Sequence, residues 1–333
     1  MKQIALTGIK PTGQPHIGNY LGMIKPALEL AEDYQALYFI ADYHALTTVK
    51  NKKELEELTY QVAATWLALG LNLEEVIFYR QSDIPEVFEL SWVLACFTSK
   101  GLLNRAHAYK TLVDENVAAG REEDKNINSG LYTYPILMAA DILLFGTHIV
   151  PVGFDQKQHL EITRDVAMTF NKTYREVLVV PEAVIRKEVM TISGLDGRKM
   201  SKSYNNVIPL FAQSNQVRKQ VMRIVTDSKR PEEPKDPDEC NVFAIYRHFA
   251  DADAVEAKRR LYLDGGLGYG DMKNELYELL ESTFSKQREQ YNALMENRNE
   301  LDKVLEQGAE KARDIAVPIL VKVRKAVGVT GSR

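Results

Sequence analysis

A glycine-containing segment near the start of the chain, residues 10–20, carries side chains that can bind phosphate groups. It reads KPTGQPHIGNY and directly follows a short apolar run that we expect to form a strand. His16 and Asn19 can donate hydrogen bonds to phosphate oxygens, while Gly13 and Gly18 allow a ligand to approach the backbone. A helix that begins here would also favour an anion at its N-terminus. The segment is neither a Walker loop nor a dinucleotide-binding fingerprint, and an ordinary glycine turn is an equally fair interpretation.

A second candidate for phosphate chemistry lies at residues 199–203, which read KMSKS. Lys199 and Lys202 stand three residues apart with hydroxyl side chains nearby, and Gly194 and Gly197 precede them. This composition suits a loop that clamps a polyphosphate, because ammonium groups bind phosphate as point charges. The alternative is a solvated basic loop without a ligand.

The elements expected around these segments indicate an α/β fold in the first half of the chain. Helical spacing of Leu58, Val62 and Trp66 follows Asn51, a plausible N-cap. Strands separated by such a helix predict a parallel sheet, and ligands bind such sheets at the carboxyl ends of the strands. Pro26 should kink or divide the helix that starts near Gly18. The four predicted strands are residues 4–7, 36–41, 76–81 and 148–152.

The character of the chain changes after residue 205, where strand patterns fade and helical periodicity takes over. Residues 276–289 and 301–327 are predicted to be helical. Residues 227–239, with three prolines and many charges, are predicted to form a linker. In the first half, residues 114–130 are polar and are predicted to form a surface excursion.

Composition excludes several classes of protein. The 333 residues carry 42 basic and 46 acidic side chains, a net charge of −4, so the chain is not a basic nucleic-acid coat protein. Two cysteines cannot build a disulfide scaffold or a site with four thiolates. We expect a cytoplasmic protein with no membrane contact, because no signal sequence or spanning segment is evident. His148, Asp155 and His159 lack the spacing of a zinc motif, so we expect no protein-bound metal.

The two candidate segments together resemble the signature motifs of class I aminoacyl-tRNA synthetases, usually written HIGH and KMSKS. The first stands here as HIGN, with Asn19 as its last residue, and the second is complete. Residues 131–143 and 150–159 closely resemble the bacterial tryptophanyl-tRNA synthetase family in particular. The resemblance covers nearly the whole chain. It implies a Rossmann-like catalytic domain with a parallel sheet and an all-helical C-terminal domain.

Within the first of those middle stretches, Tyr134, Met138 and Asp141 recur at spacings of four and three, which places them on one helix face. An aromatic ring, a thioether and a carboxylate suit an indole, whose N–H needs an acceptor. Periodicity alone favours an ordinary core face with an ion-paired Asp141. The resemblance reverses this preference, because the family's tryptophan-selecting aspartate aligns with Asp141.

The resemblance also implies a reaction and a set of site residues. Tryptophan and ATP would form tryptophanyl-adenylate, and the acyl group would pass to the terminal ribose of tRNA(Trp). ATP would arrive with Mg²⁺ held mainly by its phosphates and water. The implied catalytic residues are His16, Asn19, Lys199 and Lys202. The implied ATP-binding residues are Lys10, Pro11, Thr12, Gly18, Asn19, Gly153, Phe154, Asp155, Val189, Lys199, Met200, Ser201, Lys202 and Ser203. The implied tryptophan-binding residues are Tyr134, Met138, Asp141, Val150, Val152 and Gln156.

The resemblance further implies a homodimer with two domains in each chain. Residues 1–205 would form the catalytic domain, with a dimerisation segment at about 85–130. Residues 206–333 would form the anticodon-binding domain, and the last helix, about 300–330, could pack back on the catalytic domain. Basic faces at Arg218, Lys219 and Arg223 and at Lys322, Arg324 and Lys325 could contact tRNA, although solvated faces are the commoner case. Trp92, Phe97, Leu102 and Leu103 are candidates for the dimer interface, with core packing as an equal alternative. From residue type alone, Trp66 and Trp92 are expected in the core.

Three other readings compete with this one. A tyrosyl-tRNA synthetase shares the fold but would typically carry glutamine where Met138 stands. A small-molecule nucleotidylyltransferase would lack the KMSKS loop and a helical RNA-binding domain. A non-catalytic synthetase-like RNA-binding protein would not require His16 or an intact loop at residues 199–203.

Overall fold

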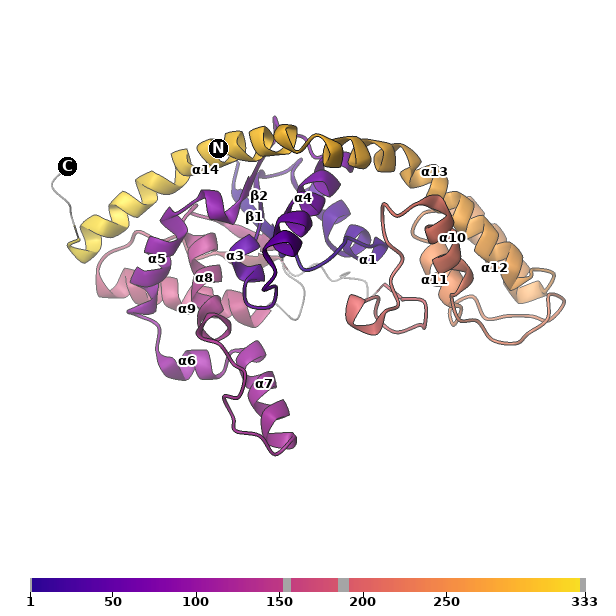
Figure 1. Ribbon diagram of the computed structural model, residues 1–333, viewed down its shortest axis with the longest axis horizontal. Helices are drawn as coiled ribbons and strands as arrows, with labels where there is room; N and C mark the ends of the chain where they lie inside the picture. The colour runs from indigo at the N-terminus through magenta and orange to yellow at the C-terminus, as the bar shows by residue number, and fades with distance from the viewer. Residues whose placement is uncertain (1, 152–156, 185–191, 330–333) are drawn as a thin grey trace.

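A parallel β-sheet forms the centre of the N-terminal half of the molecule (Figure 1). The computed structural model describes residues 2–151, 157–184 and 192–329. In the described residues the strands lie in the order β3-β2-β1-β4-β5. The chain therefore builds outward from β1 on one side and resumes on its other side with β4, and such a switch point forms a ligand crevice. The strands are β1 (Ile4–Ile9), β2 (Gln35–Ile40), β3 (Val76–Arg80), β4 (Ile149–Pro151) and β5 (Glu182–Val184).

The four predicted strands are confirmed, and β5 was not predicted. Its three residues pair with β4, where Ala183 lies opposite Val150. Glu182 and Ala183 are exposed. A three-residue edge strand whose first two side chains are exposed has neither the apolar run nor the alternation by which a strand is recognised in a sequence.

The predicted helix after Asn51 is α4 (Lys52–Ala68), and its cap is present. The Asn51 side chain accepts a hydrogen bond from the Glu54 backbone N–H at 3.1 Å. Val62 and Trp66 are buried on the face that covers the sheet, and the Trp66 ring lies 5.1 Å from that of Tyr38 in β2. This packing gives α4 the tertiary support that most protein helices need.

Pro26 divides its helix in a particular way. α1 (Ile17–Asn19) runs into a π-helical turn, η1 (Tyr20–Ile24), and then into α2 (Lys25–Leu30). The Lys25 backbone N–H bonds to the carbonyl of Tyr20, one residue further back than in an α-helix. Since Pro26 has no N–H to donate, a wider turn immediately before it lets the helix continue.

A group of short helices follows the carboxyl ends of β2 and β3 and extends away from the sheet. These are α3 (Asp42–Ala45), the 3₁₀ turn η2 (Gln81–Asp83), α5 (Glu86–Ala95), α6 (Lys100–Asn104) and α7 (His107–Ala118). The predicted surface excursion at residues 114–130 is mostly exposed, as expected, and its first residues belong to α7, which continues to Ala118. Buried Asn116 donates to the carbonyls of Glu123 and Lys125, so the following loop is closed by side-chain bonds. The longer helices α8 (Ser129–Leu143) and α9 (Lys157–Thr173) complete this half of the molecule.

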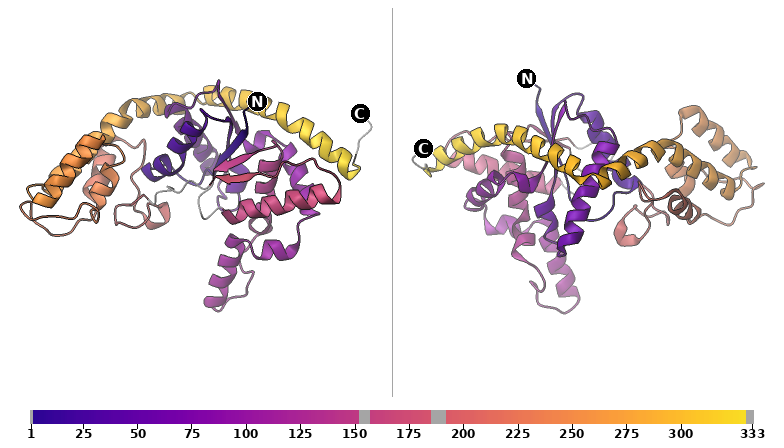
Figure 2. Two further views of the ribbon diagram at one scale, coloured as in Figure 1. Left: turned by 180° about the vertical axis from the view of Figure 1, so that it is seen from behind. Right: turned by 45° about the horizontal axis from the view of Figure 1, so that its top comes forward.

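The C-terminal part is helical, as predicted. It contains α10 (Ser214–Met222), α11 (Asn241–Tyr246), α12 (Ala252–Asp264), α13 (Tyr269–Glu296) and α14 (Arg298–Val327). The linker at residues 227–239 contains no helix or strand. α13 and α14 follow one another as a long arch that spans the molecule (Figures 1 and 2).

Helix α14 packs on the edge strand β3 of the sheet. A Cβ on Gly308 would lie 1.7 Å from the Phe78 carbonyl oxygen, so only glycine permits this approach. Further along, Arg313 pairs with Glu86, and Arg324 pairs with Glu89 of α5. The arch therefore covers an edge that would otherwise be open to pairing with another strand. Because Glu89 holds Arg324, that side chain is not a free member of the basic face proposed near the C-terminus.

The interface candidates divide between core and surface. Trp66 is 1% exposed, as expected, but Trp92 on α5 is 74% exposed and the expectation of a core position is wrong for it. Leu103 is buried and belongs to the main core cluster, and Phe97 packs edge-on against Phe170. In the parts of the chain that the structure describes, no helix combines the length and the apolar character that crossing a membrane requires.

Candidate active site

The two signature segments meet in space although they are far apart in the sequence. The Ile17 N–H donates to the Ile208 carbonyl at 3.0 Å, and the Leu210 N–H donates to the Pro15 carbonyl at 3.1 Å. Within the signature segments themselves, the Gly18 N–H points to the Met200 sulfur at 3.2 Å. Met200 is buried, so the predicted ATP-binding position is filled by a side chain that joins the two segments.

Lys202 lies against the loop that follows β1. A Cβ on Gly13 would lie 2.8 Å from the Lys202 ammonium nitrogen, and Gly13 has a φ of +141°. The surrounding atoms partly desolvate the ammonium group and lower the pKa of Lys202 to about 8, although much of the side chain is still exposed. The structure thus brings one loop lysine to the first segment, and Lys199 is exposed on the same loop.

His16 is a neutral group at physiological pH. It is 6% exposed, and burial together with the nearby Lys202 charge lowers the pKa of His16 to about 4. Its Nδ1 atom has no hydrogen-bond partner among the described residues. The Asn19 side chain accepts a bond from the His16 backbone N–H at 3.0 Å, so it holds the start of α1. His16 can offer one N–H to an oxygen but not a positive charge.

Asn206 organises the KMSKS loop and was not predicted from the sequence. It is 3% exposed, and its side-chain oxygen accepts from the Ser201 N–H at 2.8 Å. Its amide nitrogen donates to the Lys199 carbonyl at 3.1 Å and to the Asp196 carboxylate at 2.6 Å. Ser201 also accepts a bond from the Ser203 N–H at 3.3 Å. The sequence feature that could have indicated it is the pair of asparagines directly after the loop. The first of them, Asn205, takes a left-handed backbone conformation that asparagine tolerates, as is typical of a turn.

The remaining predicted residues of the first segment occupy different surroundings. The Lys10 ammonium donates to the Thr47 hydroxyl at 2.8 Å, and burial lowers its pKa. Pro11 is buried and Thr12 is exposed. Lys10 therefore reaches toward the loop after α3.

Asp141 is a buried carboxylate with two donors. It is 2% exposed, and its Oδ2 lies 2.9 Å from Nε2 of His44. The Gln81 amide donates to both of its oxygens, at 2.8 and 2.9 Å. Desolvation raises the pKa of Asp141, and the two partners offset this effect only in part. His44 and Gln81 were not predicted as site residues; their signal was their position directly after the second and third strands.

The other predicted residues of this helix face lie beside Asp141. The Tyr134 hydroxyl bonds to the His159 ring, and the Tyr134 ring lies 6.1 Å from that of His44. Burial raises the pKa of Tyr134 to about 12. Met138 is half-buried against the main core, and Val150 is buried in β4. A cavity of about 330 Å³ lies beside this helix face, and its lining includes His44, Tyr134, Thr47, Phe88 and Leu137 but neither Asp141 nor Met138.

Six predicted site residues lie outside the described residues: Val152, Gly153, Phe154, Asp155, Gln156 and Val189. Among the residues that are described, no group of three or more histidine, cysteine, aspartate or glutamate side chains is placed to hold a metal ion.

The fold and the joined motifs define a class. Residues 2–285 match the family described as tRNA synthetases class I (W and Y), so the chain belongs to this family and the resemblance is confirmed. The chain is 50% identical over 333 residues to the tryptophan–tRNA ligase of Pseudomonas aeruginosa, which covers 98% of this chain and 74% of that protein. It is 46% identical over 331 residues to the tryptophan–tRNA ligase of Neisseria meningitidis, with 98% of each chain covered.

A solved structure gives the same assignment. The tryptophanyl-tRNA synthetase of Campylobacter jejuni, complexed with ADP and tryptophan, superposes with a TM-score of 0.90 at 44% identity. The match covers 98% of this chain and 100% of that chain. These relatives favour the tryptophanyl branch over the tyrosyl branch, so the chain belongs with the bacterial tryptophanyl enzymes.

Proposed function

We propose that this chain catalyses the tryptophan–tRNA ligase reaction, in which ATP activates L-tryptophan and the acyl group then passes to tRNA(Trp). The observation that carries the proposal is a buried Asp141 held by Gln81 and by His44, which lines a cavity, in a chain whose two signature segments are joined. The names of the relatives agree with this activity.

The first step is the in-line attack of the tryptophan carboxylate on the α-phosphorus of ATP. This step needs no covalent enzyme intermediate, so positioning and charge stabilisation supply the catalysis. Lys199 and Lys202 stabilise the departing pyrophosphate, and His16 and Asn19 lie on the other side of the phosphates. Mg²⁺ enters with ATP, bound mainly by the phosphates and water. The contact of Lys202 with Gly13 supports this arrangement, because it places the cation over the loop after β1.

Discrimination among amino acids is assigned to Asp141. Its carboxylate accepts the indole N–H, while Tyr134 and Met138 line the rest of the helix face. Phenylalanine has no N–H on its ring, so its binding would leave the buried acceptor unpaired and would lose binding free energy. Sites of this kind can reject an analogue that lacks the donor by about 10⁴-fold or more. The same acceptor distinguishes indole from an isosteric ring that has no donor.

The second step requires tRNA, and we assign its recognition to the helical part after residue 205. α13 and α14 run from this part to the sheet (Figure 2), and through them an anticodon bound far from the crevice is connected to the catalytic part. We further infer a homodimer, with exposed Trp92 on α5 as the leading interface residue. Tryptophan, ATP and tRNA are all cytoplasmic substrates, so we place the enzyme there.

ATP–pyrophosphate exchange with each amino acid in turn tests the proposal. Exchange by the wild type that requires tryptophan, and that is lost or relaxed in Asp141→Asn, would support both the substrate and the indole contact. Exchange with tyrosine in place of tryptophan would move the chain to the sister enzyme. If folded protein bound tRNA but supported no exchange, the catalytic proposal would be wrong and a binding role would replace it.

A further inference from the structure

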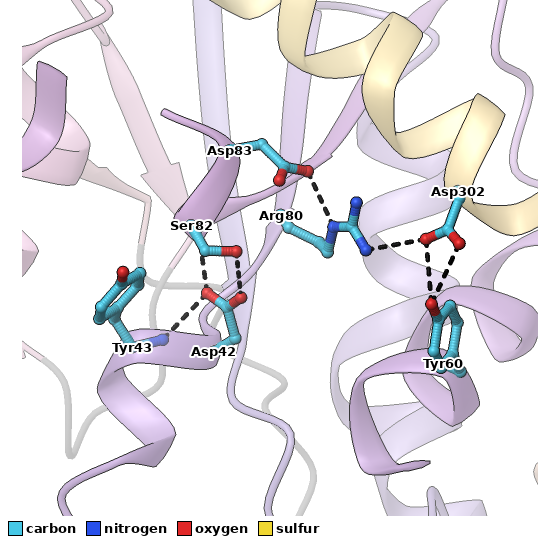
Figure 3. Close-up of polar contacts among 7 residues, drawn as sticks. All are labelled: Asp42, Tyr43, Tyr60, Arg80, Ser82, Asp83 and Asp302. Carbon is cyan, nitrogen blue, oxygen red and sulfur yellow. Dashed lines mark hydrogen bonds and ion pairs between the residues drawn. The ribbon is translucent and has the colours of Figure 1, made fainter. Parts of the chain in front are cut away.

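Asp42 and Ser82 link the two elements that hold Asp141 (Figure 3). Asp42 begins α3, and Ser82 is the central residue of η2. The Ser82 hydroxyl donates to Asp42 Oδ2 at 2.5 Å, and the Ser82 backbone N–H donates to Asp42 Oδ1 at 3.1 Å. The Tyr43 N–H donates to the same Oδ1 at 2.9 Å. One half-buried carboxylate therefore accepts three bonds from two segments.

This link begins where the sheet ends. The last paired residues of β2 and β3 are Ile40 and Arg80. Beyond these residues the two segments no longer form a β-ladder. They must nevertheless stay close together for His44 and Gln81 to reach the Asp141 carboxylate. The bonds from Ser82 to Asp42 join the two segments two residues past the ladder, two residues before His44 and one residue after Gln81.

A second hydrogen-bond network, centred on Arg80, holds the other side of η2. The Arg80 guanidinium donates to Asp83 at 2.8 Å and to Asp302 of α14 at 2.9 Å, and the Tyr60 hydroxyl donates to both Asp302 oxygens at 3.1 Å (Figure 3). The two networks leave η2 little freedom. Of the two, only the Asp42 network includes α3, the element that carries His44.

We propose that Asp42 and Ser82 are positioning residues for indole recognition: they clamp α3 to η2 so that His44 and Gln81 hold both oxygens of Asp141 in one orientation. The inference rests on the proposed role of Asp141 as the indole acceptor. A buried acceptor discriminates only while its direction is fixed, because a carboxylate that can turn or admit water no longer penalises a ligand without a donor.

The test compares tryptophan with benzothienylalanine, an isostere in which sulfur replaces the indole N–H. The ratio of their kcat/KM values in ATP–pyrophosphate exchange measures recognition of the N–H, and a loss of folded enzyme cancels from it. Asp42→Asn keeps the shape but turns one acceptor oxygen into a donor. We expect it to lower the wild-type ratio by about tenfold, the effect of one displaced hydrogen bond.

Three further variants make the result specific. Ser82→Ala removes the hydroxyl and should lower the ratio by about three- to tenfold. Ser82→Thr keeps a hydroxyl and should have a ratio close to that of the wild type. Glu275→Gln is the matched control, because Glu275 accepts a bond from Tyr246 and pairs with Lys258 in the helical part. It should leave the ratio unchanged even if it lowers stability.

The outcomes separate this inference from the function on which it rests. A wild type that does not discriminate between the two amino acids overturns the role of Asp141 itself. A discriminating wild type whose ratio is unchanged in Asp42→Asn and Ser82→Ala overturns the inference and leaves the function intact. If Asp42→Asn fails to fold, the Ser82 pair decides, and equal ratios for Ser82→Ala and Ser82→Thr count against the clamp.

Discussion

The nucleotide end and the amino-acid end of the candidate site are built in opposite ways. At the nucleotide end, the lysines are exposed. The first segment is joined to the KMSKS loop by the contact between Gly18 and Met200, and to residues 208–210 after the loop by backbone hydrogen bonds. At the amino-acid end, Asp141 is 2% exposed and its partners come from two other elements. A charge near solvent can be removed with little loss of stability, whereas a buried charge is coupled to the packing around it.

The largest effect should come from Lys202→Ala at the nucleotide end. We expect adenylate formation to slow by about 10²- to 10³-fold, because the cation acts on charge that develops in the transition state. Tryptophan affinity should change by less than about twofold, since that contact lies elsewhere. Single-turnover kinetics and equilibrium binding of tryptophan measure the two quantities. Equal losses in both would argue against a transition-state role.

Asp141→Ala should lower stability where Lys202→Ala does not. Removing the carboxylate leaves the His44 and Gln81 donors without their acceptor, which should cost about 1–3 kcal/mol of unfolding free energy. Lys202→Ala should stay within about 0.5 kcal/mol of the wild type. Urea denaturation of both variants checks the contrast. A similar loss of unfolding free energy in Asp141→Ala and Lys202→Ala would mean that the two ends of the site do not differ in their coupling to stability.

Asn206→Asp tests whether the nucleotide end has a buried determinant of its own. The change replaces a donor to Asp196 and Lys199 by an acceptor, and we expect kcat for exchange to fall about tenfold. The double variant Asn206→Asp with Asp196→Asn exchanges donor and acceptor and should recover part of the loss. Failure of this rescue, with a folded protein, would show that Asn206 acts by some route other than its bond to Asp196.

The smallest effect is a pH dependence of the nucleotide end. The pKa of Lys202 is about 8, so the lysine is charged below that pH and loses its charge as the pH rises through it. The value of kcat/KM for ATP, which reports the free enzyme, should therefore fall about threefold between pH 7.5 and 8.5. Lys202→Arg keeps its charge throughout and should be flat over this range. A wild-type profile as flat as that of the arginine variant would contradict the assignment.

The sequence was informative wherever a pattern is local. Four strands, the capped helix after Asn51 and the helical C-terminal part could be predicted because apolar periodicity and capping act over a few residues. β5 could not be predicted, since a strand of three residues that begins with two exposed side chains carries no such pattern. Trp92 was misjudged because residue type alone does not decide burial, and its helix turns this side chain outward, where it is 74% exposed.

By itself, the sequence determined the residue types that do the chemistry: the histidine and glycines of the first segment, the lysines of the second, and a carboxylate on a helix face with Tyr134. Only the tertiary structure decided which groups meet them. His44 and Gln81 reach Asp141 from 97 and 60 residues away, and Asn206 holds the KMSKS loop through bonds to its backbone. The physical reason is that hydrogen bonds between distant segments depend on strand order and loop direction, and no local periodicity records either.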